Sequence, residues 1–286
     1  MPSVRQTISD FRTRLADRYP ATETDVFIRI LFSEYFGMSP ADIHLQPDRE
    51  LSAADQERIS SAVDALQRYC PIQYIVGETE FYGLRFKVTP DVLIPRPETE
   101  ELTDWIVKER ASTNPKILDI GAGSGCIAVS LAVNIPHAEV WAMDVSERAL
   151  AIAKNNADFN EASVRFVNGD ILSTDATELF PEAYFDIIVS NPPYVAPAEK
   201  PLMQANVTEY EPHLALFPPG DDPLIFYKCI AAFGQIRLKT GGNLFFEINE
   251  AYPEETATIL QRFGYSDVTV RKDINGKYRM AFGRKV

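Results

Sequence analysis

The feature that most constrains the fold is an alternation of strand-like and helix-like segments after residue 98. Short apolar runs, rich in β-branched and aromatic residues, are predicted to be strands at 116–120, 139–143, 164–167, 185–189 and 243–248. Helix-like stretches accompany them at 126–134, 146–159, 223–238 and 253–263. Such alternation is typical of parallel strands joined by crossover helices, with ligand sites at the carboxyl ends of the strands. The predicted fold class is therefore α/β, with a doubly wound sheet.

The end of the chain predicts a departure from the parallel pattern. Val268–Arg271 and Tyr278–Gly283 are strand-like, and Asn275-Gly276 between them is a strong signal for a tight hairpin turn. We therefore expect a mostly parallel sheet with an antiparallel last strand.

Residues 1–75 carry helical patterns instead. In the clearest stretch, Ile59 and Leu66 belong to a set of apolar residues at helical spacing. Ser52 and Asp55 precede this set at the spacing of a capping box, which marks the start of a helix. This part of the chain is predicted to be a small helical bundle.

A third pattern joins these two parts. Residues 76–97 combine glycines and prolines with β-branched and aromatic residues, and Tyr82-Gly83 lies near the centre of a predicted hairpin. The predicted organisation is a helical domain (1–75), a β-hairpin linker (76–97) and an α/β domain (98–286).

Charge and composition exclude several classes of protein. The 28 basic and 41 acidic residues give a net charge of −13, whereas proteins that grip nucleic-acid phosphates normally carry a basic face. We therefore expect no direct nucleic-acid partner. No apolar run approaches the roughly 18 residues of a membrane-spanning helix, and the sequence MPSVRQTISDFRTRL lacks the apolar core of a secretory signal.

The cysteine pattern indicates a reducing compartment such as the cytoplasm. Cys70, Cys126 and Cys229 are odd in number, far apart and without a CxxC pair, which argues against a disulfide framework and a cysteine-rich zinc site. We expect a soluble cytoplasmic protein without a membrane anchor and without a metal.

The first group of residues that carries chemistry is the sequence Asp119-Ile120-Gly121-Ala122-Gly123-Ser124-Gly125, between a predicted strand and a predicted helix. Glycines there let the backbone approach a ligand and present amide groups at a helix start. The dinucleotide pattern G-x-G-x-x-G needs a glycine where Cys126 stands, and no phosphate-binding lysine follows. The G-x-G-x-G form suits S-adenosylmethionine, which has no phosphate; a tight structural turn is the alternative.

Two acidic residues end the next strands. Asp144 lies where a carboxylate commonly accepts hydrogen bonds from ribose hydroxyls, about two dozen residues after the glycines. The alternative is an N-cap role, for which Ser146 competes. Asp170 follows the third strand, at a position that either flanks an adenine or is an ordinary loop residue.

The most specific motif is Asn191-Pro192-Pro193-Tyr194, directly after the apolar strand at 185–189. The prolines remove two backbone donors and stiffen the segment. The Asn191 side-chain oxygen and the Pro192 carbonyl can then accept the two hydrogens of a planar NH2 group, while Tyr194 offers a flat surface. A structural turn of this composition is the alternative.

These acceptors fit a particular chemistry. An amide nitrogen is a poor nucleophile because its lone pair is delocalised into the carbonyl. Acceptors on its hydrogens stabilise the positive charge that grows as the nitrogen attacks a sulfonium methyl group. The motif therefore indicates methyl transfer to a conjugated NH2 group, without a metal or a strong base.

With these motifs assembled, the chain resembles the release factor glutamine methyltransferases, the PrmC/HemK family of protein-(glutamine-N5) methyltransferases. The resemblance spans nearly the whole chain and rests on PIQYIVGETEFYGLRFKVTPDVLIPRPETE (71–100), DIGAGSGCIA (119–128), SNPPY (190–194) and the helical N-terminal part. It implies a class I S-adenosylmethionine-dependent methyltransferase fold. The implied substrate is the glutamine in the Gly-Gly-Gln loop of class 1 peptide-chain release factors.

The resemblance also implies roles for individual residues. The glycine loop should line the methionine end of the cofactor, Asp144 should bind the ribose, and Asp170 with Ile171 should lie by the adenine. The full cofactor-binding set is Gly121, Ala122, Gly123, Ser124, Gly125, Asp144, Asp170, Ile171 and Asn191. The substrate-binding set is Asn191, Pro192, Pro193 and Tyr194, of which Asn191, Pro192 and Tyr194 are the expected catalytic residues.

Other expectations concern the rim and the helical part. Arg96 or Glu98 could act directly at the cofactor cleft, or form a salt-bridged linker. The helical domain should recognise the body of the release factor, because one glutamine side chain offers little surface for specificity.

The chain departs from the family pattern at a few positions. Ala122 stands where threonine is common, Ile171 where an aromatic residue can stack on adenine, and Asn249 where the family usually has glycine. Three other functions remain as alternatives: methylation of a ribosomal-protein glutamine, methylation of adenine N6 in nucleic acid, and cofactor binding without catalysis.

Overall fold

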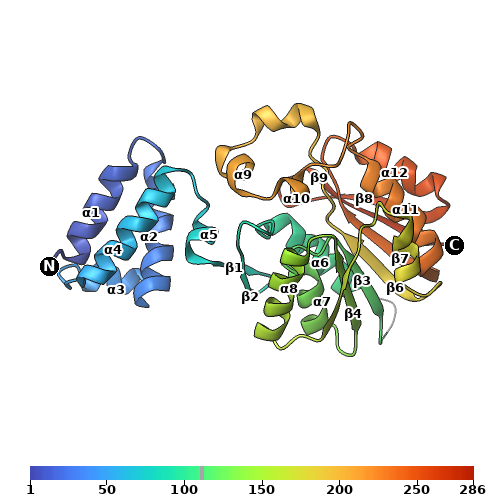
Figure 1. Cartoon of the computed structure of the whole chain (residues 1–286), viewed down its shortest axis with the longest axis horizontal. Helices are drawn as coiled ribbons and strands as arrows, with labels where there is room; N and C mark the ends of the chain where they lie inside the picture. Colours follow the sequence, from blue (N-terminus) through green and yellow to red (C-terminus); the bar gives the residue numbers. More distant parts are fainter. Residues whose placement is uncertain (110–112) are drawn as a thin grey trace. The chain divides into compact units, whose positions relative to one another are not determined.

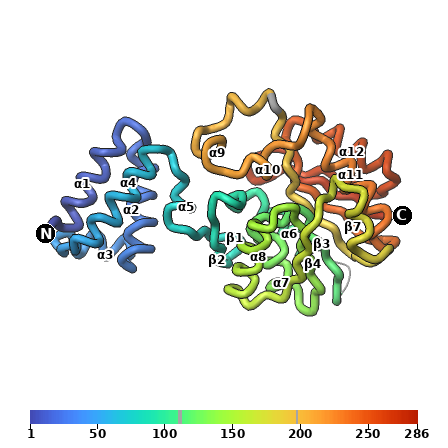
Figure 2. Tube along the Cα trace, in the orientation of Figure 1, coloured from blue at the N-terminus to red at the C-terminus, as the bar shows by residue number. Residues whose placement is uncertain are grey.

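The computed structural model describes residues 1–109 and 113–286, and it divides into two compact units. The helical unit comprises Met1–Gly77 and Gln204–Tyr210, and the sheet unit comprises Glu78–Met203 and Glu211–Val286. Figure 1 labels the elements of both units, and Figure 2 traces the chain through them.

The helical unit is built from short amphipathic helices. They are α1 (Val4–Leu15), α2 (Ala21–Phe36), α3 (Pro40–Leu45), α4 (Ala53–Gln67), α5 (Ile72–Val76) and α9 (Ala205–Tyr210). The predicted capping box at the start of α4 is confirmed: the Ser52 side chain accepts from the Asp55 amide, and the Asp55 carboxylate accepts from the Ser52 amide. Fully buried side chains such as Phe11, Phe32 and Leu66 form the core of this unit.

The sheet unit begins with a hairpin. Strands β1 (Glu78–Phe81) and β2 (Leu84–Lys87) pair in antiparallel fashion around Tyr82 and Gly83. Phe81 and Phe86 are fully buried, and they cluster with Val129 and Ala157 of the sheet unit. The hairpin is therefore packed into the sheet unit and is more than a free connection.

The described part of the sheet unit contains one large sheet in the order β5-β4-β3-β6-β7-β9-β8. Its strands are β3 (Lys116–Ile120), β4 (Glu139–Asp144), β5 (Val164–Asn168), β6 (Phe185–Ser190), β7 (Leu238–Glu247), β8 (Tyr265–Lys272) and β9 (Tyr278–Lys285). The five neighbouring strands β5, β4, β3, β6 and β7 are parallel, and β9 is antiparallel to both β7 and β8. The predicted α/β class and the antiparallel last strand are confirmed.

Helices cover both faces of the sheet. They are α6 (Pro97–Glu109), α7 (Cys126–Asn134), α8 (Glu147–Phe159), α11 (Ile225–Arg237) and α12 (Pro253–Arg262). The connections also contain the short helix α10 (His213–Leu216) and the 3-10 turns η1 (Thr174–Leu179) and η2 (Pro197–Leu202). Successive strand residues enter different cores: Ile187 packs with α6 and α7, whereas Ile188 packs with α11 and α12. This alternation is that expected for strands buried on both faces.

The strand order reverses next to β3. The chain runs from β3 outward through β4 and β5, and then returns to place β6 on the other side of β3. At such a switch point the loops after the two neighbouring strands diverge, which opens a crevice at their carboxyl ends. The loops concerned are the glycine loop after β3 and the Asn191 segment after β6.

Candidate active site

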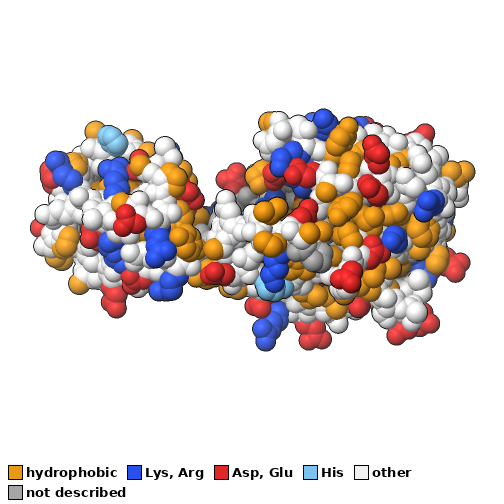
Figure 3. Space-filling model, turned by 90° about the horizontal axis from the view of Figure 1, so that it is seen from above, with side chains coloured by type: hydrophobic (Ala, Val, Ile, Leu, Met, Phe, Trp, Pro, Cys, Tyr) orange, Lys and Arg blue, Asp and Glu red, His pale blue; other side chains and the backbone are white. Residues whose placement is uncertain are grey.

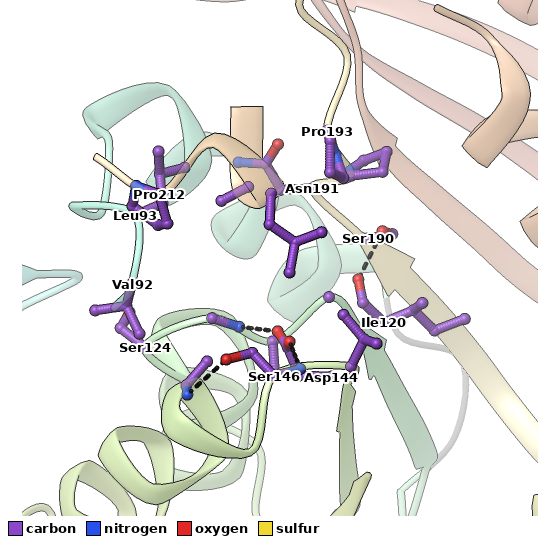
Figure 4. Close-up of a pocket in the computed structure, with 18 of the residues that line it drawn as sticks. Val92, Leu93, Ile120, Ser124, Asp144, Ser146, Ser190, Asn191, Pro193 and Pro212 are labelled. Carbon is purple, nitrogen blue, oxygen red and sulfur yellow. Dashed lines mark hydrogen bonds between the residues drawn. The ribbon is translucent and has the colours of Figure 1, made fainter. Parts of the chain in front are cut away.

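A cavity of about 1000 Å³ lies at this switch point, within the sheet unit. Its wall includes the glycine loop after β3, the acidic end of β4, the segment after β5 and the Asn191 segment after β6. In Figure 4, Asn191 lies across the cavity from Asp144 and Ser124. The hydroxyl of Ser190 donates to the Ile120 carbonyl at 2.6 Å and so ties the ends of β6 and β3 together.

Backbone hydrogen bonds fix the glycine loop. The amide groups of Gly121 and Ala122 both donate to the Met143 carbonyl, at 2.8 and 3.0 Å. The Gly123 amide donates to Oδ2 of Asp144 at 2.8 Å. The loop after β3 is thus attached to the end of β4 through its main chain, largely independent of its own side chains.

Gly125 has a different place from the rest of the loop. It is the N-cap of α7 with φ of +79°, and a Cβ built on it would lie 3.0 Å from the Cβ of Ala153. Both the conformation and the close approach favour glycine. The predicted loop residues that line the cavity are Gly121, Ala122, Gly123 and Ser124, whereas Gly125 packs between helices and does not line it.

Asp144 uses both carboxylate oxygens. Oδ2 accepts from the Gly123 amide, and Oδ1 accepts from the Ser146 amide at 2.8 Å. Ser146 is the N-cap of α8, where it accepts from the Ala149 amide, so Asp144 is not needed as the cap. Burial raises the pKa of Asp144. Each carboxylate oxygen has a second acceptor position, so Asp144 at the cavity wall can still bind hydroxyl groups.

The segment after β5 completes this side of the cavity. Asp170 and Ile171 both line it, so the adenine-side position that the family resemblance implies for them is open to a ligand. The Asp170 carboxylate accepts from the Leu172 amide at 2.9 Å, which forms a local turn. Ile171 also packs against the core beneath α11.

Asn191 lies at the edge of the cavity, and the nitrogen of its side-chain amide is hydrogen-bonded. Nδ2 donates to Oγ1 of Thr99 at 3.3 Å. Oδ1 has no hydrogen-bond partner among the residues that the structure describes, and Asn191 lines the cavity together with Pro192 and Pro193. The loop of Gly121 is adjacent, because a Cβ built there would lie 4.0 Å from the Asn191 carbonyl oxygen.

Tyr194 does not form the flat pocket surface that the sequence motif predicts. Its hydroxyl donates to Oε1 of Glu247 at 2.9 Å, and its ring packs against the core on the α11 side. Glu247 is 1% exposed, so the tyrosine is drawn toward a buried carboxylate and does not line the cavity. This contact can hold the turn behind the two prolines in place.

Arg96 lines the cavity, whereas Glu98 does not. The Arg96 guanidinium pairs with the Glu211 carboxylate at 2.5 Å, and Glu211 is 4% exposed. Burial raises the pKa of Glu211, opposed by the charge of Arg96. The salt-bridged alternative for Arg96 is therefore present in the structure, and it connects the start of α6 to the segment before α10.

Sequence reasoning missed the residues that brace the cavity wall from behind. Fully buried Asn156 donates to the carbonyls of Ser124 and Lys87, at 2.8 and 3.0 Å, and accepts from the Lys87 amide at 2.7 Å. It thereby joins the glycine loop to the hairpin. A polar residue within the apolar face of α8 was the only local signal for it.

Asp119, at the start of the glycine loop, is a second residue with no role predicted from the sequence. It is fully buried, and one oxygen accepts from the Ala128 amide at 3.2 Å. The other oxygen has no partner among the described residues. Burial raises the pKa of Asp119 to about 7. A buried carboxyl oxygen without a hydrogen-bond partner lowers the stability of the fold at the base of the glycine loop.

Within residues 1–109 and 113–286, no group of three or more His, Cys, Asp or Glu side chains is arranged to hold a metal ion. In the same part of the chain, no helix has both the length and the apolar character needed to cross a bilayer.

Together, these features define a class. A doubly wound sheet with an antiparallel last strand, a glycine loop without a phosphate-binding lysine, an acidic end to the second strand and Asn-Pro-Pro-Tyr at the switch point are those of a class I methyltransferase.

Comparisons with known proteins narrow the class to a family. Residues 99–215 match the model of the methyltransferase small domain, and residues 6–77 match that of the PrmC N-terminal domain. A release factor glutamine methyltransferase of Bacteroides thetaiotaomicron is 47% identical over 94% of this chain and 95% of its own length. One from Flavobacterium psychrophilum is 44% identical over 96% and 97%. The chain belongs to the release factor glutamine methyltransferase family, as its motifs predicted.

Solved structures agree on the fold. A methyltransferase from Pyrococcus furiosus superposes with a TM-score of 0.53, at 20% identity, over 82% of this chain and 99% of its own. At this identity the likeness shows the class I fold alone.

Proposed function

We propose that this protein transfers a methyl group from S-adenosylmethionine to the side-chain amide nitrogen, N5, of the glutamine in the Gly-Gly-Gln loop of class 1 peptide-chain release factors. The family relationship supports this substrate. The observation that carries the reaction is the Asn191 amide at the cavity edge, with Nδ2 engaged by Thr99 and Oδ1 available.

The cavity wall fits the proposed cofactor. The main chain of Gly121–Ser124 would hold the methionine end, Asp144 would accept from the ribose hydroxyls, and Ile171 would contact the adenine. The absence of a phosphate-binding lysine from the loop agrees with a ligand that has no phosphate. Bound there, S-adenosylmethionine supplies a methyl group activated on a sulfonium.

The substrate amide would be held by two acceptors. Oδ1 of Asn191 and the Pro192 carbonyl would each accept one hydrogen of the glutamine NH2 group, which aims the nitrogen into the cavity. As the nitrogen gains the methyl group it becomes positive, and both acceptors then interact with it more strongly than in the ground state. The extra proton becomes acidic at that stage and leaves to solvent, so no strong base is required.

The rim of the cavity offers surface for a protein substrate. Leu214 lines the cavity and is 58% exposed, and Leu202, two residues beyond the cavity-lining Lys200, is 85% exposed. In the face of the molecule shown in Figure 3, hydrophobic side chains gather on the sheet unit between scattered charges. Apolar rim residues suit a protein loop better than a phosphate backbone, as does the net charge of −13.

Two further parts of the proposal follow from the same substrate. The helical unit recognises the body of the release factor, which supplies the contact area that a single glutamine lacks. The protein acts in the cytoplasm, where release factors work and where its three cysteines, all free in the structure, stay reduced.

The proposal is tested by incubating the protein with S-adenosylmethionine and a purified class 1 release factor, and locating any added methyl group by tandem mass spectrometry. A release factor with asparagine in place of the Gly-Gly-Gln glutamine is the matched control. One methyl group on the glutamine, absent from the control, is the expected result. An unmodified release factor, with methyl transfer to a ribosomal protein or to adenine instead, would contradict the proposal.

A further inference from the structure

The direction of the Asn191 amide matters because its two ends have opposite hydrogen-bonding character. Oδ1 accepts, whereas Nδ2 donates. A half-turn about the Cβ–Cγ bond would exchange them and present donors to the NH2 group of a substrate amide. Only one of the two orientations can serve the proposed reaction.

A chain of hydrogen bonds behind Asn191 selects that orientation. Nδ2 of Asn191 donates to Oγ1 of Thr99 at 3.3 Å, and the Thr99 hydroxyl donates to Oε2 of Glu247 at 2.6 Å. Thr99 has a single hydroxyl hydrogen, and Glu247 takes it. Toward Asn191, Thr99 can therefore act only as an acceptor, and the amide must turn its nitrogen to Thr99 and its oxygen away.

Glu247 in turn is held as an acceptor on both oxygens. Oε1 accepts from the Tyr194 hydroxyl at 2.9 Å, while Oε2 accepts from Thr99. Thr99 is 2% exposed and Glu247 is 1% exposed, so water does not compete for these bonds. Burial raises the pKa of Glu247, whereas the hydrogen bonds from Thr99 and Tyr194 and the charge of Arg279 oppose that shift.

We propose that Thr99 and Glu247 are positioning residues that set the direction of the Asn191 amide, so that its oxygen faces the substrate; this inference rests on the proposed function. Both act through Asn191: Glu247 does not line the cavity, and Thr99 does, but the single hydrogen of its hydroxyl is taken by Glu247. Without the Glu247 carboxylate, the Thr99 hydroxyl could donate to Oδ1 of Asn191, and the amide would turn its donors toward the substrate.

Helix α6 offers a matched control. Thr103 lies one turn after Thr99 on the same helix and is equally buried, but its hydroxyl donates only to the backbone carbonyl of Thr99, at 3.0 Å. Replacement of either threonine by valine removes one buried hydroxyl and keeps the side-chain shape. Only the replacement of Thr99 breaks the chain to Asn191.

The test compares Thr99→Val, Thr99→Ser, Thr103→Val and Glu247→Met with the wild-type protein in steady-state methylation of the release factor. Glutamine would keep an oxygen that can accept from Thr99, whereas methionine removes both acceptor oxygens at a similar side-chain length. We expect kcat to fall roughly 10- to 100-fold in Thr99→Val and Glu247→Met, less than for loss of a group that contacts the reacting atoms. KM for the release factor and the affinity for S-adenosylmethionine should stay within a few-fold of the wild-type values. Thr99→Ser keeps the hydroxyl and should restore kcat, and Thr103→Val should leave it unchanged.

Three outcomes would overturn the inference: wild-type kcat in both Thr99→Val and Glu247→Met, an equal loss in Thr99→Val and Thr103→Val, or no recovery in Thr99→Ser. Thermal unfolding of each variant checks that it folds, and Glu247→Met tests the same chain if Thr99→Val does not fold. Failure of the proposed function is recognised separately, because the wild-type protein would then transfer no methyl group to the glutamine.

Discussion

The two sides of the cavity are held in place in different ways. The glycine loop is held through its own main chain: the Gly121 and Ala122 amides donate to the Met143 carbonyl, and the side chains of Asp144 and Asn156 bind the loop's backbone rather than its side chains. The segment that begins at Asn191 is fixed by side chains far away in the sequence, Thr99 and Glu247. A main-chain frame tolerates side-chain changes, whereas a frame of side chains depends on each of them.

This difference matches the two tasks. A cofactor that is common to many methyltransferases needs a cradle, which a short glycine-rich segment can build from its own main chain. An amide substrate needs acceptors in exact directions, and side-chain hydrogen bonds supply direction. We therefore expect changes on the Asn191 side to affect turnover, and changes on the glycine side to affect affinity or stability.

The largest effect is expected for Asn191→Ala. It removes an acceptor that strengthens in the transition state, so turnover should fall roughly 100- to 1000-fold, as for loss of an oxyanion-hole donor. The affinity for S-adenosylmethionine should stay within a few-fold, because the cradle is intact. Single-turnover kinetics with calorimetry of cofactor binding separate the two effects. A rate within a few-fold of the wild type would refute the role of Asn191.

Asp144→Ala is the converse change on the cofactor side. It removes a partly buried carboxylate that accepts from two amides and is proposed to bind the ribose. Cofactor affinity should fall roughly 10- to 100-fold, since hydrogen bonds to charged groups contribute about 1.5–3 kcal/mol. Turnover at saturating cofactor should change little. Unchanged affinity in calorimetry would restrict Asp144 to a structural role.

Gly125→Ala tests how far the main-chain frame depends on glycine. Gly276, in the turn between β8 and β9, has the same φ of +79° but nothing within 4 Å of a Cβ, so Gly276→Ala isolates the conformational cost. That cost is roughly 1–2 kcal/mol. Contact with Ala153 should add about 1 kcal/mol or more in Gly125→Ala. Urea denaturation of both variants gives the comparison, and equal losses would show that the contact with Ala153 is relieved at no cost.

The smallest effect concerns the buried carboxyl at the base of the loop. Burial raises the pKa of Asp119 to about 7 from an ordinary value of 3.8, so between these values the native state binds a proton that the unfolded chain has released. Stability contributed by this group therefore falls as the pH rises from about 4 to 7. Asp119→Asn cannot titrate and should show a smaller loss of unfolding free energy between pH 5 and pH 8. If Asp119→Asn lost as much unfolding free energy as the wild type, the pH dependence would come from a group other than Asp119.

The sequence predicted what is encoded locally. Strand β6 and the glycine loop after β3 follow from apolar runs and from glycines at fixed spacing, and the Asn-Gly turn before β9 follows from two residues. The roles of Asn156 and of the hydrogen bonds from Asn191 through Thr99 to Glu247 could not be predicted. The bonded residues are 32 to 148 positions apart in the sequence, and only the tertiary fold brings them together. The motif gave Tyr194 the wrong place for the same reason: its partner, Glu247, is 53 residues away.

The most direct test of the proposed role of Asn191 is a crystal structure of the protein with S-adenosylhomocysteine and a peptide that contains Gly-Gly-Gln. N5 of the glutamine should lie within hydrogen-bond distance, about 2.7–3.2 Å, of both Oδ1 of Asn191 and the Pro192 carbonyl. Nδ2 of Asn191 should still face Thr99. A glutamine bound through its own carbonyl oxygen to Nδ2 of Asn191, with N5 turned away from Pro192, would contradict it.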